Sequence, residues 1–173
     1  MKTNKSVVAM FAAVAILVTA GAIGMIVSVL PVQAAGDPIV VIVNGSNPVE
    51  NLSMGELRKL FLCDRDHWGS GRAVAPVMPV AGAPERTLFL KVVFGMNDAD
   101  FDRYFLQASF TGKSATPPKE VGSEQEVRRV VGNSPGAIGF VRFSDLQTAS
   151  NSVIKVVRID GAAPTDPAYR IHM

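Results

Sequence analysis

The feature that most constrains this chain is a run of 24 residues without a charged side chain, from Val7 to Leu30. A helix formed by this run is apolar on every face, which does not suit the surface of a globular domain, and about 20 apolar residues suffice to cross a bilayer. Lys2 and Lys5 precede the run, and a small-residue cleavage pattern, Val32-Gln33-Ala34, follows it. We therefore expect residues 1–34 to be a cleaved signal peptide or, alternatively, a retained membrane anchor.

Either fate would export residues 36–173 to the periplasm or to the outer face of the cytoplasmic membrane, with membrane contact only through the N-terminal segment. The chain has 17 Lys and Arg against 15 Asp and Glu, and Lys2 and Lys5 make up the excess. A neutral body lacks the cationic surface that holds nucleic-acid phosphates, so we expect no nucleic-acid partner. The single cysteine, Cys63, indicates a body stabilised by its hydrophobic core without disulfides.

Strand and helix patterns alternate beyond the N-terminal segment. The β-branched run from Pro38 to Val43 predicts a strand buried on both faces, and Asn44 to Pro48 predict a turn after it. Ser53 and Glu56 fit a capping box that opens a helix ending near Cys63. A second strand is expected at residues 74–80.

Its two prolines favour an edge position or irregular ends for that strand. The remaining expected elements, in order, are a helix at 84–94, a helix at 97–106, a mobile loop at 111–119, a second capping box opening a helix at 123–131, a strand at 137–141, a last strand at 152–159 and a loop-like tail with a disordered His172. This order predicts an α/β domain with a mixed sheet flanked by helices, formed by residues 36–173.

Several short words of the sequence, in a fixed order, resemble a known family. They are Val43-Asn44, Ser46-Asn47-Pro48-Val49, Leu52-Ser53, Glu56-Leu57, Leu60-Phe61-Leu62, Trp68 and Ser134-Pro135-Gly136-Ala137-Ile138-Gly139-Phe140-Val141. In these words and their order, the sequence resembles the short, single-lobe proteins of the phosphate ABC-transporter substrate-binding family. Full-length members have two α/β lobes that close on an anion, and this chain resembles only the second. The resemblance implies a single periplasmic-binding-protein-like lobe.

The loop that would hold the anion departs from the family pattern. The resemblance implies an arginine and a glycine–serine–glycine–threonine stretch at the start of a helix, whereas this chain has Pro79 to Thr87 there. Ala83 replaces a hydroxyl, Pro84 removes an N–H donor, and Glu85 adds a negative charge. Arg86 and Thr87 are the remaining polar candidates for ligand binding. The alternative is that Glu85 favourably meets the helix N-terminus and Arg86 is a solvated side chain.

Ser46 and Asn47 form a second candidate pair, because loops after buried strands of α/β sheets often bind ligands. The alternative is that they only build the turn from Asn44 to Pro48. Trp68 could stack on a ligand, although a lone tryptophan near a helix end is more typical of a core residue.

Other side chains predict neither metal binding nor catalysis. Asp64, Asp66 and His67 lack the spacing of a calcium loop, so we expect a solvated loop there. Cys63 and His67 lack a third orienting group and an oxyanion hole. We therefore expect no enzyme activity, no cofactor and no metal.

Two functions of different class remain open. The first is an exported solute-binding-like protein that captures phosphate or another small anion near Ser46 and Arg86 for an ABC-type membrane transporter. The alternative is a membrane-tethered interaction module that has lost solute binding and contacts another cell-envelope protein.

Overall fold

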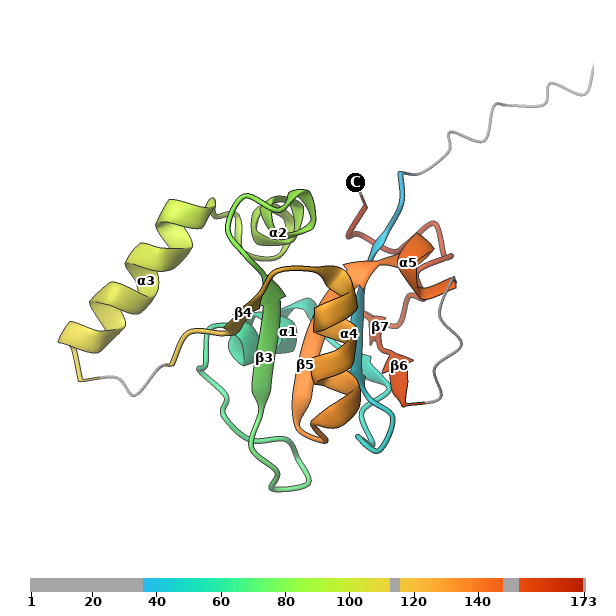
Figure 1. Cartoon of the computed structure of the whole chain (residues 1–173), viewed down its shortest axis with the longest axis horizontal. Coiled ribbons are helices and arrows are strands. Elements are labelled where there is room, and N and C mark those ends of the chain that lie inside the picture. The colour runs from blue at the N-terminus through green and yellow to red at the C-terminus, as the bar shows by residue number, and fades with distance from the viewer. Residues whose placement is uncertain (1–35, 113–115, 148–152, 173) are drawn as a thin grey trace, which may run out of the picture. The chain divides into compact units, whose positions relative to one another are not determined.

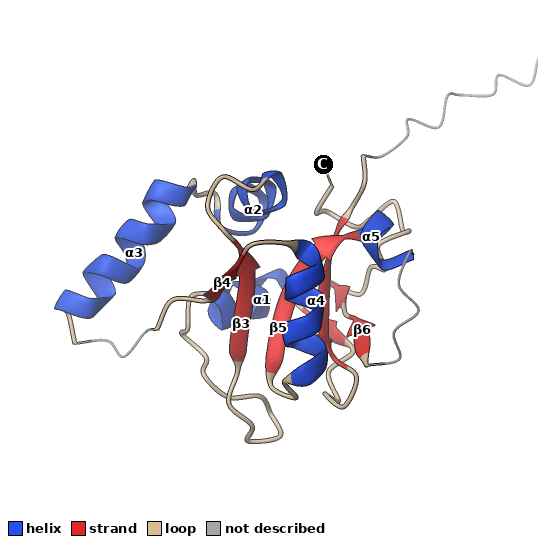
Figure 2. Cartoon of the chain, viewed as in Figure 1, coloured by secondary structure: helices blue, strands red, loops and turns tan. Residues whose placement is uncertain are grey.

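The computed structural model describes residues 36–112, 116–147 and 153–172. Figures 1 and 2 show their arrangement. The elements are β1 (Ile39–Asn44), β2 (Asn51–Leu52), α1 (Met54–Phe61), β3 (Ala75–Pro79), α2 (Pro84–Phe89), the π-helix η1 (Leu90–Phe94), α3 (Asp98–Phe110), β4 (Lys119–Val121), α4 (Glu124–Asn133), β5 (Ala137–Arg142), α5 (Phe143–Gln147), β6 (Ile154–Val156) and β7 (Arg158–Ile159). The expected signal or anchor segment, residues 1–34, lies outside the described residues.

A five-stranded mixed sheet forms the centre of the domain, in the order β4-β3-β5-β1-β6. β3 runs parallel to β4 and β5, whereas β1 runs antiparallel to β5 and β6. β2 and β7 form a separate parallel pair. The α/β class and the mixed sheet are confirmed. Because β3, β4 and β5 run in the same direction, their carboxyl ends meet at one edge of the sheet.

Strand β1 is buried along all six residues, as its unbroken apolar sequence predicts. Its side chains alternate between two cores. Ile39, Val41 and Val43 face the core that contains α1, α2 and η1. Val40 and Ile42 face the core under α4. In Figure 2, α4 lies in front of the sheet and α1 lies behind it, so helices cover both faces.

Gly139 of β5 allows α4 to lie close to the sheet. A Cβ atom built at this position would lie 2.7 Å from Val127 Cγ1, 3.2 Å from Val131 Cγ2 and 3.2 Å from the Val77 carbonyl oxygen. No side chain fits there without movement of its neighbours. The glycine is therefore required by packing, as expected for glycine inside a buried strand.

Helix boundaries follow the expected caps. Ser53 and Glu56 form the complete capping box of α1. At α4, Ser123 accepts a hydrogen bond from the Glu126 N–H, but the Glu126 carboxylate accepts from Gly122 N–H, so only half of the expected box forms. Gly95 has a φ of 69° and ends η1 in the left-handed conformation, which glycine adopts without steric cost.

Two predictions about the strands are wrong. β3 is an interior strand, so the edge position expected for it is wrong. Its outer side is covered by β4, a three-residue strand that begins at Lys119, the last residue of the expected loop. The expected last strand divides at Val157 into β6 and β7, which pair in different sheets.

The C-terminal tail packs against the domain. The Tyr169 hydroxyl donates a hydrogen bond to the Ile39 carbonyl at 2.7 Å, and Ile171 is fully buried. His172 forms an isolated bridge with Pro38, so the prediction that His172 is disordered is wrong.

No helix among the residues that the structure describes combines the length and hydrophobicity that a membrane span needs.

Candidate functional site

The carboxyl ends of β3, β4 and β5 border a polar pocket of about 440 Å³. Helices α2 and α4 begin at this edge, each directly after the loop that leaves a strand. The lining residues are Pro79, Ala83, Glu85, Gly122, Ser123, Glu124, Gln125, Arg128, Arg142 and Asp145. In open α/β sheets this edge is the usual place for a ligand, and helix N-termini attract anions.

Arg142 lines the pocket and is the last residue of β5. Its Nη2 is 2.6 Å from Glu85 Oε1, and its Nε is 3.1 Å from Glu124 Oε1 and 3.6 Å from Asp145 Oδ2. The hydrogen bond with Glu124 is the largest of the effects that raise the pKa of Arg142. The guanidinium therefore has three carboxyl groups of this chain around it.

Two of these carboxyl groups belong to the first turns of the helices. Glu85 is the second residue of α2 and is only 4% exposed, and Glu124 is the first residue of α4. A negative group in this position interacts favourably with the helix dipole. The chain's own carboxyl groups thus occupy the place where an external anion would meet Arg142 and the helix N-termini.

Glu124 differs from an ordinary surface glutamate. Desolvation by burial is the main cause that raises its pKa to about 8, and the neighbouring Asp145 and Glu85 raise the pKa further, whereas Arg142 lowers it. Burial therefore favours the neutral form of the Glu124 carboxyl, which can donate a hydrogen bond within the pocket.

Arg86 faces away from this pocket and is fully buried. Its Nε lies 2.5 Å from Asp98 Oδ1, and its Nη1 lies 2.5 Å from Glu120 Oε1 and donates to the Pro79 carbonyl at 3.1 Å. Asp102 adds a contact at 3.5 Å. The prediction of a solvated Arg86 is wrong, because α3 and β4 close over this side of α2 and supply the carboxylates.

Thr87 lies on the exposed side of α2, and its hydroxyl donates to the Ala83 carbonyl at 3.2 Å. Ser46 and Asn47 lie at the opposite edge of the sheet, because they follow the carboxyl end of the antiparallel strand β1. The structure therefore does not bring Ser46 and Asn47 together with Arg86 and Thr87 in one site.

The turn from Asn44 to Pro48 is confirmed. The Asn47 N–H donates to the Asn44 carbonyl at 2.9 Å, and the Asn44 side-chain oxygen accepts from the Ser46 N–H and hydroxyl. Asn47 is 1% exposed, and its side-chain oxygen accepts from the Val49 N–H. These polar groups stabilise the turn itself.

Trp68 is a core residue, as expected, because it is 2% exposed and its Nε1–H donates to the Gly136 carbonyl at 2.9 Å. Asp66 and His67 lie on an exposed loop, where the hydrogen bond with His67 lowers the pKa of Asp66. Across the described ranges, no three His, Cys, Asp or Glu side chains are grouped to hold a metal ion.

Sequence reasoning missed the residues that form the polar pocket, Arg142, Glu124 and Asp145, and two partners of Arg86, Asp98 and Glu120. A signal existed for Arg142, which directly follows the predicted strand 137–141 and so belongs to its carboxyl end. Glu124 could also be placed at a helix N-terminus from the Ser123 cap. The partners of Arg86 depend on tertiary contacts without a local pattern.

Solved structures of phosphate-transport proteins share this fold. A protein assigned to phosphate ABC transport from Clostridium perfringens, solved with bound phosphate, has a TM-score of 0.60 at 19% identity over 76% of this chain and 48% of that chain. The ABC-type phosphate transport receptor from Vibrio cholerae has a TM-score of 0.59 at 21% identity, over 76% and 49% of the two chains. PstS from Borrelia burgdorferi has a TM-score of 0.61 at 12% identity, over 76% and 50%.

The fold is therefore that of a periplasmic-binding-protein-like lobe. More narrowly, it is similar to one lobe of phosphate ABC-transporter substrate-binding proteins, and the chain spans about half the length of these structures. No protein-family model and no curated protein matches the chain significantly.

Proposed function

We propose that this chain is an exported, non-enzymatic, solute-binding-like lobe that acts as an interaction module of the cell envelope. The observation that carries the proposal is the pairing of buried Glu85 with Arg142 at 2.6 Å. This pair, together with Glu124, satisfies the charged and polar groups that would otherwise receive a small anion. An anion would have to displace a carboxylate of the chain itself.

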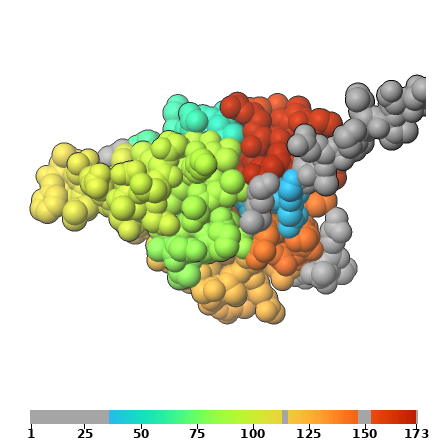
Figure 3. Space-filling model, turned by 90° about the horizontal axis from the view of Figure 1, so that it is seen from above, coloured from blue at the N-terminus to red at the C-terminus, as the bar shows by residue number. Residues whose placement is uncertain are grey.

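Helix α3 supports a role in protein contacts. It extends away from the sheet in Figure 1 and forms a projecting end of the domain in Figure 3. It carries two exposed apolar side chains, Leu106 at 59% and Phe110 at 84%. Exposed large apolar side chains that lie together are typical of surfaces that bind other proteins. The partner would be another cell-envelope protein. A retained N-terminal segment would hold the module at the membrane beside this partner, and a cleaved one would release the module to meet it.

Capture of phosphate or another small anion for ABC-type transport is the second candidate function. The fold of the phosphate-transport proteins favours it, and the Arg142 side chain keeps 41% exposure beside the pocket. Arg86, Thr87, Ser46 and Asn47 remain predicted ligand-binding residues for this function. Arg86 would have to exchange its carboxylate partners for the anion.

Calorimetric titration of the purified protein with sodium phosphate separates the two functions. The interaction module is expected to show millimolar affinity or weaker. A micromolar dissociation constant, with one phosphate bound per chain, would contradict the interaction module and support anion capture as the function. Sodium sulfate serves as the control anion, because a site that is selective for phosphate would bind phosphate more tightly than sulfate.

A further inference from the structure

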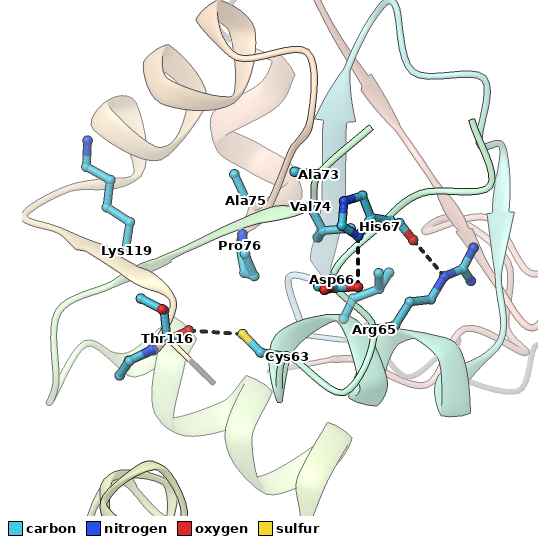
Figure 4. A pocket seen from close by; sticks show the side chains of 12 residues that line it. Cys63, Arg65, Asp66, His67, Ala73, Val74, Ala75, Pro76, Thr116 and Lys119 are labelled. Atoms are coloured by element: carbon cyan, nitrogen blue, oxygen red, sulfur yellow. Dashed lines mark hydrogen bonds and ion pairs between the residues drawn. The ribbon is translucent and has the colours of Figure 1, made fainter. Parts of the chain in front are cut away.

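A second pocket, of about 420 Å³, lies beside the N-terminal end of β3 (Figure 4). Arg142 is the last residue of the parallel neighbour β5 and therefore lies at the opposite edge of the sheet. The end of α1, the loop after it, the chain entering β3 and the segment before β4 form its walls. Cys63 Sγ contacts the Thr116 carbonyl at 3.0 Å and thereby joins the α1 wall to the wall before β4. The pocket is therefore built from three separate segments of the chain, within residues 60–67, 73–76 and 116–119.

The lining is mainly apolar. Leu60 is fully buried beneath the pocket, and Val74, Pro76 and Pro117 provide the hydrocarbon surface that a ligand can contact. Pockets of this size that combine apolar walls with a few polar groups are typical sites for small organic molecules. A ligand here would place an apolar body against these side chains.

The pocket lining contains more basic than acidic side chains, namely Arg65, Lys119 and His67 against Asp66. Asp66 Oδ1 lies 2.9 Å from His67 Nδ1, so the carboxylate of the lining is already engaged. Arg65 donates to the His67 carbonyl at 3.0 Å and reaches Glu56 at 3.6 Å. Lys119 forms no ion pair with any residue that the structure describes. In Figure 4 its ammonium group points away from Val74 and Pro76, so a change of rotamer brings it to a ligand at the rim.

From this arrangement we infer that the pocket binds a small amphipathic acid, a molecule with an apolar body and one carboxylate or sulfonate group. The body contacts Val74, Ala75 and Pro76, and the acidic group pairs with Lys119. Inorganic phosphate is a poor ligand because it has no apolar surface to bury. This site is separate from the polar pocket around Arg142, and the inference does not depend on the proposed function.

Calorimetric titration with 2-naphthoate tests the inference. The protein is purified in the form that the cell produces from the full chain. Two analogues with the same ring system, 2-naphthylmethylammonium and naphthalene-2-methanol, replace the acidic group by a cation or a neutral hydroxyl. We expect one saturable site that prefers 2-naphthoate to both analogues and from which 10 mM phosphate does not displace it. No saturable binding, stronger binding of the ammonium analogue, or displacement by phosphate would overturn the inference.

Variants locate the site. Ala75→Trp should fill the pocket and weaken 2-naphthoate binding at least tenfold, whereas Ala99→Trp, the same change on exposed α3, should stay within twofold of wild type. Lys119→Met should weaken 2-naphthoate at least threefold and leave naphthalene-2-methanol within twofold. If Ala75→Trp does not fold, Thr116→Trp blocks the facing wall and should give the same loss. Undiminished binding in the blocked variant, or equal loss of both ligands in Lys119→Met, would refute the assignment.

Discussion

Replacing Arg86 tests the ion cluster that joins α2 to α3 and β4. The guanidinium is fully buried and contacts Asp98, Glu120 and Asp102 at 2.5, 2.5 and 3.5 Å. Arg86→Met keeps most of the side-chain volume but leaves three neighbouring carboxylates without their cation and the Pro79 carbonyl without its donor. Breaking a buried ion pair from one side costs about 3–5 kcal/mol.

The three carboxylates keep partial contact with water, with side-chain exposures of 27%, 48% and 66%, which places the expected cost near the lower end of that range. For a domain of this size we expect the melting temperature to fall by about 10 °C. Differential scanning calorimetry measures the change. Adding Asp98→Asn and Glu120→Gln should recover part of the loss, because the uncompensated charges are removed. A melting temperature within 2 °C of wild type for Arg86→Met would refute the cluster.

Three further outcomes are expected. Residues 36–173 should express as a soluble, cooperatively melting domain, and an unfolded fragment would contradict a self-contained lobe. Gly139→Val should lower the free energy of unfolding by at least about 1–3 kcal/mol in urea titrations, while Gly55→Ala, where an added Cβ would have no neighbour closer than 4.0 Å, should not. Because folding raises the pKa of Glu124 from 4.5 to about 8, wild type should lose stability relative to Glu124→Gln as the pH rises from about 4.5 to 8, and a pH-independent difference would disprove the shift.

Much of the fold was predictable because its signals are local. The continuous β-branched run of β1, the Ser53 capping box and the left-handed Gly95 each act through neighbouring residues. β4 escaped prediction because three residues, Lys119 to Val121, form a strand only by pairing with β3. The burial of Tyr169 and Ile171 likewise depends on β1, which is distant in sequence.

The candidate site was predictable only in part. The resemblance to the substrate-binding family implies that Glu85 stands where an anion would bind in that family, and the structure places this carboxylate in the first turn of α2. Its partner could not be paired with it from sequence alone, because Arg142 approaches from β5, 57 positions later. The burial of Arg86 was missed for the same reason, since its carboxylates come from α3 and β4.

Closure of the anion site by the chain's own carboxylates is tested most directly by comparing phosphate binding to wild type, Glu85→Gln and the control Glu126→Gln, with ¹⁵N chemical shifts of the α2 and α4 N-termini as the readout. Glu126 also lies in the first turn of α4 but pairs with Arg129 at 3.1 Å and not with Arg142. We expect Glu85→Gln to bind phosphate at these N-termini at least tenfold more tightly than wild type, and Glu126→Gln to behave as wild type. Wild-type binding at these amides that equals or exceeds that of Glu85→Gln would contradict the claim that the chain's own carboxylates close the site.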